Sequence, residues 1–162
     1  MTRVQASSTV KNIRARLTLP NTPPYNGTNI AQQLGYKIIH RSLTGRLATL
    51  AGYADHTTNT IILNTNVHVH MINLTAVRLA LVLYRNIQPT TENYTLILDR
   101  NPLWAGQSDE MIQNARDAAD ILAPWTAIKK IWGTYGTQNI HQIRDIFMIP
   151  SVHIVDIVQH NT

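Results

Sequence analysis

The two residues with the clearest potential for metal chemistry are His68 and His70, which are separated by one residue. On a strand both would project from the same face, so two imidazoles could bind one ion. A zinc site needs at least three protein ligands, and no third ligand obviously converges on this pair. We therefore expect a solvated pair in the loop before a buried helix, with metal ligation as the alternative.

A second candidate for chemistry is a pair of carboxylates, Asp117 and Asp120, on a predicted helix. Paired carboxylates can perform acid–base catalysis, but a spacing of three on a helix is more typical of an exposed, solvated face. The sequence has no Gly-x-Ser-x-Gly elbow, no phosphate-binding glycine loop and no cysteine. Thiol catalysis, thiolate zinc sites and disulfides are therefore excluded.

Basic residues near the N-terminus are the candidate phosphate contacts. Lys11, Arg14 and Arg16 have near-helical spacing, and the whole chain carries a net charge of +5. Such a charge is compatible with an acidic partner such as nucleic acid, bound through phosphates without sequence preference.

The elements that must position these residues fit one domain, because 162 residues with 44% hydrophobic content can bury a single core. We expect a flexible basic arm over residues 1–28 and one domain over 29–162. The longest aliphatic run, 79–83, has five residues, against about 20 for a membrane span. With no apolar leader in the sequence, we expect a cytoplasmic protein without a membrane partner.

Hydrophobic periodicity and turn residues predict an α+β fold. A small antiparallel sheet of about three strands is expected to pack on a helical body, with one further edge strand at 94–98. The predicted strands are 36–40, 43–53 and 60–64. The predicted helices are 29–34, 74–84, 108–122, 139–147 and 151–158, together with one that begins at 125 and stops at Gly133 or Gly136.

The order of elements resembles a known family. The stretch IAQQLGYKIIHRSLTGRLATLAGYADHTTNTIILN (30–64) is similar to the lead-in of the ImmA/IrrE-like zinc metallopeptidases. The segment QNARDAADILAP (113–124) is similar to the helix that carries the family's third zinc ligand, and 139–158 is similar to its tail. The resemblance covers roughly residues 29–160 and implies a zincin-like core with a helix-turn-helix-like C-terminal tail.

The chain departs from this family where the metal would bind. The family's His-Glu-x-x-His motif falls on 77–81 or 78–82, which contain neither histidine nor glutamate, and the third-ligand position is Gln113. Arg78 would place a fixed positive charge where the resemblance implies a cation. We expect Arg78 to pair with Glu110 or Asp117, with binding of a substrate carboxylate or phosphate as the alternative. The residues expected to line the vestigial cleft are Val77, Arg78, Leu81 and Gln113.

These observations favour a catalytically inactive relative of the family, without cofactor or catalytic residues, that acts as a protein-binding regulatory module. The resemblance implies a phage or mobile-element context and a regulatory partner, with a helix-turn-helix repressor as one candidate. One alternative is a metal-dependent peptidase with rebuilt ligands from His68, His70 and either Asp55 or Asp117. The other is a nucleic-acid-binding regulator that uses the basic arm.

Overall fold

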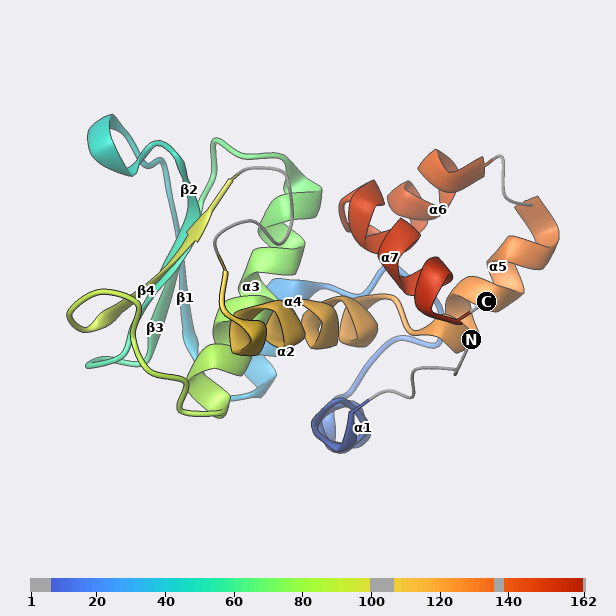
Figure 1. Ribbon diagram of the computed structural model, residues 1–162, viewed down its shortest axis with the longest axis horizontal. Helices are drawn as coiled ribbons and strands as arrows, with labels where there is room; N and C mark the ends of the chain where they lie inside the picture. The colour runs from blue at the N-terminus through green and yellow to red at the C-terminus, as the bar shows by residue number, and fades with distance from the viewer. Residues whose placement is uncertain (1–6, 100–106, 136–138, 162) are drawn as a thin grey trace.

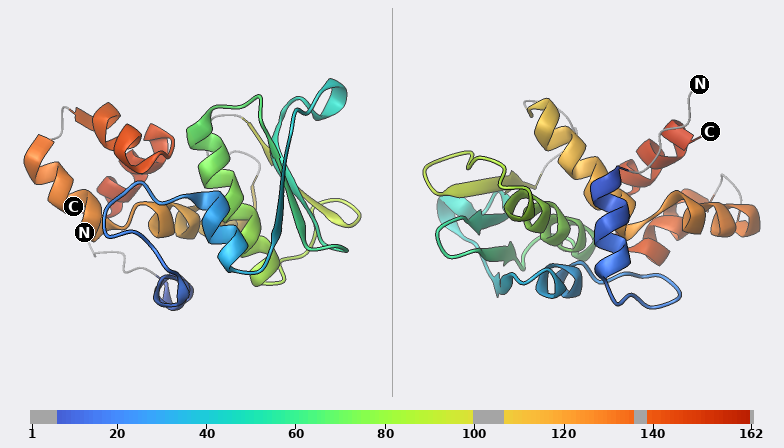
Figure 2. Two further views of the ribbon diagram at one scale, coloured as in Figure 1. Left: turned by 180° about the vertical axis from the view of Figure 1, so that it is seen from behind. Right: turned by 90° about the horizontal axis from the view of Figure 1, so that it is seen from below.

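The protein is α+β, with a four-stranded sheet at one end and helices filling the rest (Figure 1). The computed structural model describes residues 7–99, 107–135 and 139–161. The described helices lie on one side of the sheet, and the other face of the sheet is turned away from them (Figure 2). This α+β architecture confirms the predicted fold class.

The sheet is mixed, with strand order β1-β3-β2-β4. Strand β1 (Lys37–Arg41) runs parallel to β3 (Thr60–Asn64), while β2 (Leu50–Asp55) is antiparallel to both β3 and β4 (Tyr94–Leu98). The prediction of an antiparallel sheet of about three strands is therefore wrong, although the edge strand at 94–98 is confirmed. The β2–β3 hairpin places β3 between β2 and β1, an arrangement that no local sequence signal specifies.

The predicted strand at 43–53 is interrupted. A 3-10 turn, η1 (Gly45–Leu47), precedes β2, and Gly45 has a φ of +61°. This left-handed backbone favours glycine and ends the extended run. The connection between β1 and β2 therefore contributes a turn instead of strand residues.

Helix α1 (Ser8–Arg16) lies where the flexible arm was expected. Its Val10 and Ile13 are buried in the helical core, and Arg14 donates a hydrogen bond to the carbonyl of Ile121. The prediction of a flexible arm is therefore wrong for this segment. Two apolar residues three apart are enough to anchor one face of a short helix once a complementary surface is present.

Helix α2 (Gly27–Gln33) is capped by Asn26 and begins two residues before the predicted start, and α3 (Val69–Tyr84) begins five residues before its predicted start. The imidazole of His68 caps α3 by accepting a hydrogen bond from the backbone N–H of His70 at 3.1 Å. Histidine is not among the preferred N-cap residues, so the pattern did not reveal this start.

Four helices complete the chain: α4 (Asp109–Leu122), α5 (Trp125–Tyr135), α6 (Ile140–Phe147) and α7 (Ser151–Asn161). Their predicted positions are confirmed. The hydroxyl of Ser108 caps α4 by accepting from the backbone N–H of Met111 at 3.2 Å. In the described ranges, no helix combines the length and apolar character that a bilayer crossing demands.

Two apolar clusters meet on α3, which is buried along most of its length. Leu74, Val77 and Leu81 pack with the helices, while Leu79 and Ala80 pack against the sheet. Helix α3 is therefore the central element from which the candidate site must be built.

Candidate functional site

The four residues expected to line a vestigial cleft do not share one cavity among the described residues. Val77 and Leu81 are fully buried in the helical core. Arg78 lies on another face of α3 and donates from Nη2 to Oε1 of Gln107 at 3.1 Å. Gln113 is exposed and donates from Nε2 to Oδ1 of Asp117 at 3.0 Å.

A polar seam joins α3 to α4. Arg85 forms an ion pair with Asp117 and donates to Oδ1 of Asn114 at 3.2 Å. The amide of Asn114 donates to the backbone carbonyl of Arg78 at 2.9 Å. The expected pairing of Arg78 with Asp117 or Glu110 is therefore wrong, because Arg85, two helical turns further along α3, takes Asp117 instead.

The histidine pair is divided between solvent and interior. The rings of His68 and His70 lie 4.4 Å apart between centroids in an edge-on arrangement at the start of α3. His68 is exposed, but His70 is 9% exposed and its Nε2 lies 3.6 Å from Oδ1 of Asp145. Burial, with a contribution from His68, lowers the pKa of His70 below its usual value. The expected solvated pair is therefore wrong for His70.

No set of three potential metal ligands is grouped anywhere in residues 7–99, 107–135 and 139–161. Asp55 lies on the sheet and Asp117 on α4, where it is held by Arg85, so neither completes a site with the histidine pair. The nearest carboxylate to the pair is Asp145, on α6.

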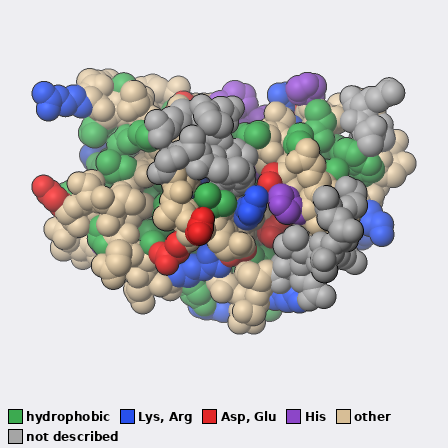
Figure 3. Space-filling model, in the orientation of Figure 1, with side chains coloured by type: hydrophobic (Ala, Val, Ile, Leu, Met, Phe, Trp, Pro, Cys, Tyr) green, Lys and Arg blue, Asp and Glu red, His purple; other side chains and the backbone are tan. Residues whose placement is uncertain are grey.

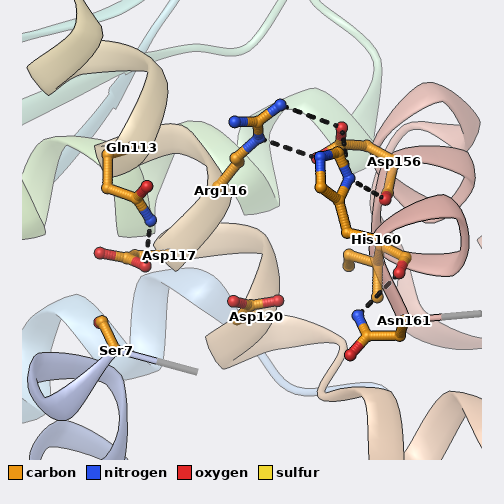
Figure 4. Close-up of a pocket in the computed structure, with 9 residues that line it drawn as sticks. Ser7, Gln113, Arg116, Asp117, Asp120, Asp156, His160 and Asn161 are labelled. Carbon is orange, nitrogen blue, oxygen red and sulfur yellow. Dashed lines mark hydrogen bonds and ion pairs between the residues drawn. The ribbon is translucent and has the colours of Figure 1, made fainter. Parts of the chain in front are cut away.

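A pocket of about 450 Å³ lies between α4 and α7, with Ser7 at its edge (Figure 4). Its polar wall carries three aspartates, Asp117, Asp120 and Asp156, together with His160. Acidic, basic and histidine side chains gather near the centre of the face shown in Figure 3. Asp117 is 1% exposed, so the prediction that it lies on a solvated face is wrong.

The charges in this pocket are unevenly paired. Asp156 forms an ion pair with Nε of Arg116 at 3.3 Å and lies 3.3 Å from Nδ1 of His160. Asp117 is paired with Arg85, but no described residue forms an ion pair with Asp120. Burial, assisted by the charges of Asp117 and Asp156, raises the pKa of Asp120 to about 7. This carboxyl can therefore exchange a proton near neutral pH.

Replacing Asp120 with asparagine tests this assignment. The folded protein keeps the Asp120 proton up to about pH 7, whereas the unfolded chain releases it near pH 4, so this group destabilises the fold as pH rises between those values. Asp120→Asn should therefore raise the free energy of unfolding by about 2 kcal/mol at pH 8 and have little effect at pH 4. Urea denaturation at both values measures this difference, and an equal effect at both would contradict the raised pKa.

The three candidate phosphate contacts do not converge on one surface. Arg14 lies 5.0 Å from the centre of the Tyr25 ring, and Arg16 lies 5.8 Å from the centre of the Tyr84 ring. Arg16 also donates to the Tyr84 hydroxyl at 3.1 Å. These two arginines therefore help to attach α1 to the body, and only Lys11 is exposed without such a contact in the described residues.

The sheet face turned away from the helices carries an apolar row that sequence reasoning missed. Strand register aligns Ile39 with Ile62, Ile62 with Tyr53, and Tyr53 with Leu96, so this row crosses all four strands. We call this surface the outer sheet face. Its Leu96 is 37% exposed, and Tyr94, which lies edge-on to Tyr53 at 5.9 Å between ring centroids, is 36% exposed. The alternation of β4 was the available signal, but only the strand order joins it to β1.

Comparison of the chain with protein-family models and with curated proteins finds no match. The resemblance to the ImmA/IrrE-like peptidases therefore remains a prediction from short sequence motifs.

Proposed function

We propose that the protein is a non-catalytic, protein-binding regulatory module that recognises its partner through the outer sheet face. The observation that carries this proposal is the apolar row across four strands, in which Leu96 is 37% exposed while Ile62 is buried beside Leu43 and Leu50. Its exposed part is on β4, where Tyr94, Leu96 and Leu98 lie on one face, and neighbouring exposed apolar side chains are typical of interaction sites. Scattered single apolar residues would not support the same conclusion.

The charges beside this row favour an acidic partner. Lys37 and Arg41 lie on β1 in register with the outer row, and Arg46 lies in η1; all three are exposed. Within the strands, Asp55 of β2 is the acidic residue on this face, because it lies two residues from Tyr53. Complementary charge would steer a partner whose contact surface combines apolar and acidic side chains.

The α3–α4 seam supports a non-catalytic role. At the positions where the resemblance implies zinc ligands, the chain has aliphatic residues and the buried cation of Arg78. The nearby carboxylate of Asp117 forms an ion pair with Arg85. Two guanidinium groups near such a position are electrostatically unfavourable for a divalent cation. The zincin-like core, the helix-turn-helix-like tail and the phage or mobile-element context remain part of this proposal. We propose a helix-turn-helix repressor as the partner, bound through a surface other than its basic DNA-reading helix.

A matched pair of substitutions tests the surface. Leu96 on β4 and Val155 on α7 are 37% and 38% exposed, so a glutamate at either position changes a similar area. With a purified repressor encoded beside this gene, Leu96→Glu should weaken binding at least tenfold, whereas Val155→Glu should change it less than twofold. Isothermal titration calorimetry measures both affinities, and circular dichroism verifies folding.

Equal effects of the two substitutions, or no binding of the repressor by the unaltered protein, would contradict the proposal. A fluorogenic-peptide assay supplies an independent check on catalysis. Peptide hydrolysis that is abolished by a chelator would contradict the non-catalytic role.

A further inference from the structure

Arg78 is a buried cation in the middle of α3. Arg78 is 6% exposed, and its Nη2 donates a hydrogen bond to Oε1 of Gln107. Its Nε is buried and has no hydrogen-bond partner among the described residues. One helical turn earlier, the hydroxyl of Thr75 is also buried and has no partner in the same part of the chain. Residues three apart lie on the same side of a helix, so α3 presents two neighbouring polar groups with unused hydrogen-bonding capacity.

No side-chain carboxylate in the described ranges forms an ion pair with Arg78. The chain has nine Asp and Glu side chains, and all nine lie in the described ranges. Asp117, Asp145 and Asp156 form ion pairs with other bases, and none of the nine pairs with Arg78. Burial lowers the pKa of Arg78 to about 10, so it remains cationic at neutral pH.

The neighbouring base His153 does not add a second charge. It is 1% exposed, and burial together with the nearby Arg78 lowers its pKa to about 3. Its neutral ring stays compatible with an anion nearby, because a neutral imidazole has one N–H donor. Within the described ranges, the interior beside α3 therefore holds one positive charge without a carboxylate partner, an arrangement that is unfavourable unless a counter-ion is present.

We propose that Arg78 anchors a binding site for a small oxyanion, a carboxylate or a phosphate, which takes the free Nε edge of the guanidinium with the Thr75 hydroxyl as a second donor. The edge formed by Nε and one Nη matches two oxygens of such a group. The site is separate from the outer sheet face, because Arg78 lies on α3 beside Gln107, Asn114 of α4 and His153 of α7. This inference therefore does not depend on the proposed protein-binding role.

Titration of the full chain with acetate and with phosphate, at constant ionic strength, tests the site. Calorimetry should detect saturable binding of at least one of these anions with a stoichiometry of one. Saturation by acetate alone identifies a carboxylate ligand, and saturation by phosphate alone identifies a phosphate ligand. Chloride at the same ionic strength should not reproduce either isotherm. No saturable binding of either oxyanion overturns the proposal.

Substitutions assign the binding to Arg78. Arg78→Met replaces the guanidinium with an apolar side chain and should reduce the affinity at least tenfold, whereas Lys129→Met, at an exposed cation on α5, should leave it unchanged. Thr75→Val keeps the side-chain shape and should reduce the affinity a few-fold, which keeps the test informative if Arg78→Met does not fold. Unchanged affinity in both Arg78→Met and Thr75→Val, or in Thr75→Val alone where Arg78→Met is unfolded, overturns the proposal.

Discussion

Asn73→Ala is expected to lower the free energy of unfolding by about 4 kcal/mol, because two buried backbone groups and one partly buried group would lose their partner. Asn73 is 8% exposed. Its Oδ1 accepts from the N–H of Gly27, and its Nδ2 donates to the carbonyls of Tyr25 at 3.3 Å and Met148 at 2.9 Å. The side chain therefore links the start of α2 and the α6–α7 turn to α3. An alanine would leave the N–H of Gly27 and the carbonyl of Tyr25 without this partner in a buried region.

Asn66→Ala is the matched control, because it removes the same side chain from an exposed position. Asn66 donates to the hydroxyl of Ser42 at 2.8 Å and to the carbonyl of Leu43 at 3.3 Å, but water can replace these contacts. We expect a loss below about 1 kcal/mol for this variant. Urea denaturation of both variants gives the comparison. Equal losses would show that burial at Asn73 does not have the expected effect.

The second large effect is expected from His153 as the pH falls. The folded protein keeps this buried imidazole neutral, with a pKa of about 3, whereas the unfolded chain takes up a proton near pH 6.5. Stability from this group is therefore complete above pH 6.5 and is lost as the pH falls toward 3. Between pH 7 and pH 4 the loss should reach about 3 kcal/mol.

The variant His153→Gln separates this contribution from the rest of the protein. Glutamine does not titrate, so the difference in unfolding free energy between the variant and the unaltered protein should shrink by about 3 kcal/mol from pH 7 to pH 4. His141→Gln is the control, because His141 is exposed on α6. A difference that stays constant with pH for His153→Gln would contradict the lowered pKa.

The comparison must use variants because a second group opposes His153. Asp120 makes the fold less stable as the pH rises between about 4 and 7, whereas His153 makes it more stable over much of the same interval. The two slopes cancel in part in the unaltered protein. A flat pH profile of the unaltered protein is therefore compatible with two large titrations that proceed in opposite directions.

Much of the helical structure could be predicted because its signals are local. The capping hydroxyl of Ser108 and the apolar spacing of Ile143 and Phe147 lie within a few residues of the structure that they specify. The hairpin of β2 and β3 is local in the same sense. The start of α3 was missed because it depends on an uncommon cap, His68.

The candidate sites were harder to predict, because burial and pairing depend on residues far apart in the chain. Asp117 was expected to be exposed, but Arg85, 32 residues away, pairs with it in the interior. The outer sheet face exists only because the strand order brings Ile39 and Leu96 into one row. Neither relation leaves a local signal in the sequence.

The sequence by itself determined the α+β class, most helix boundaries and the absence of thiol chemistry, since each depends on composition or on neighbours along the chain. Only the tertiary structure decided that β1 is parallel to β3, that α1 is anchored and that Arg78 is buried without a carboxylate. The physical reason is that capping and periodicity act over a few residues. Burial and charge compensation depend instead on which distant segments pack together.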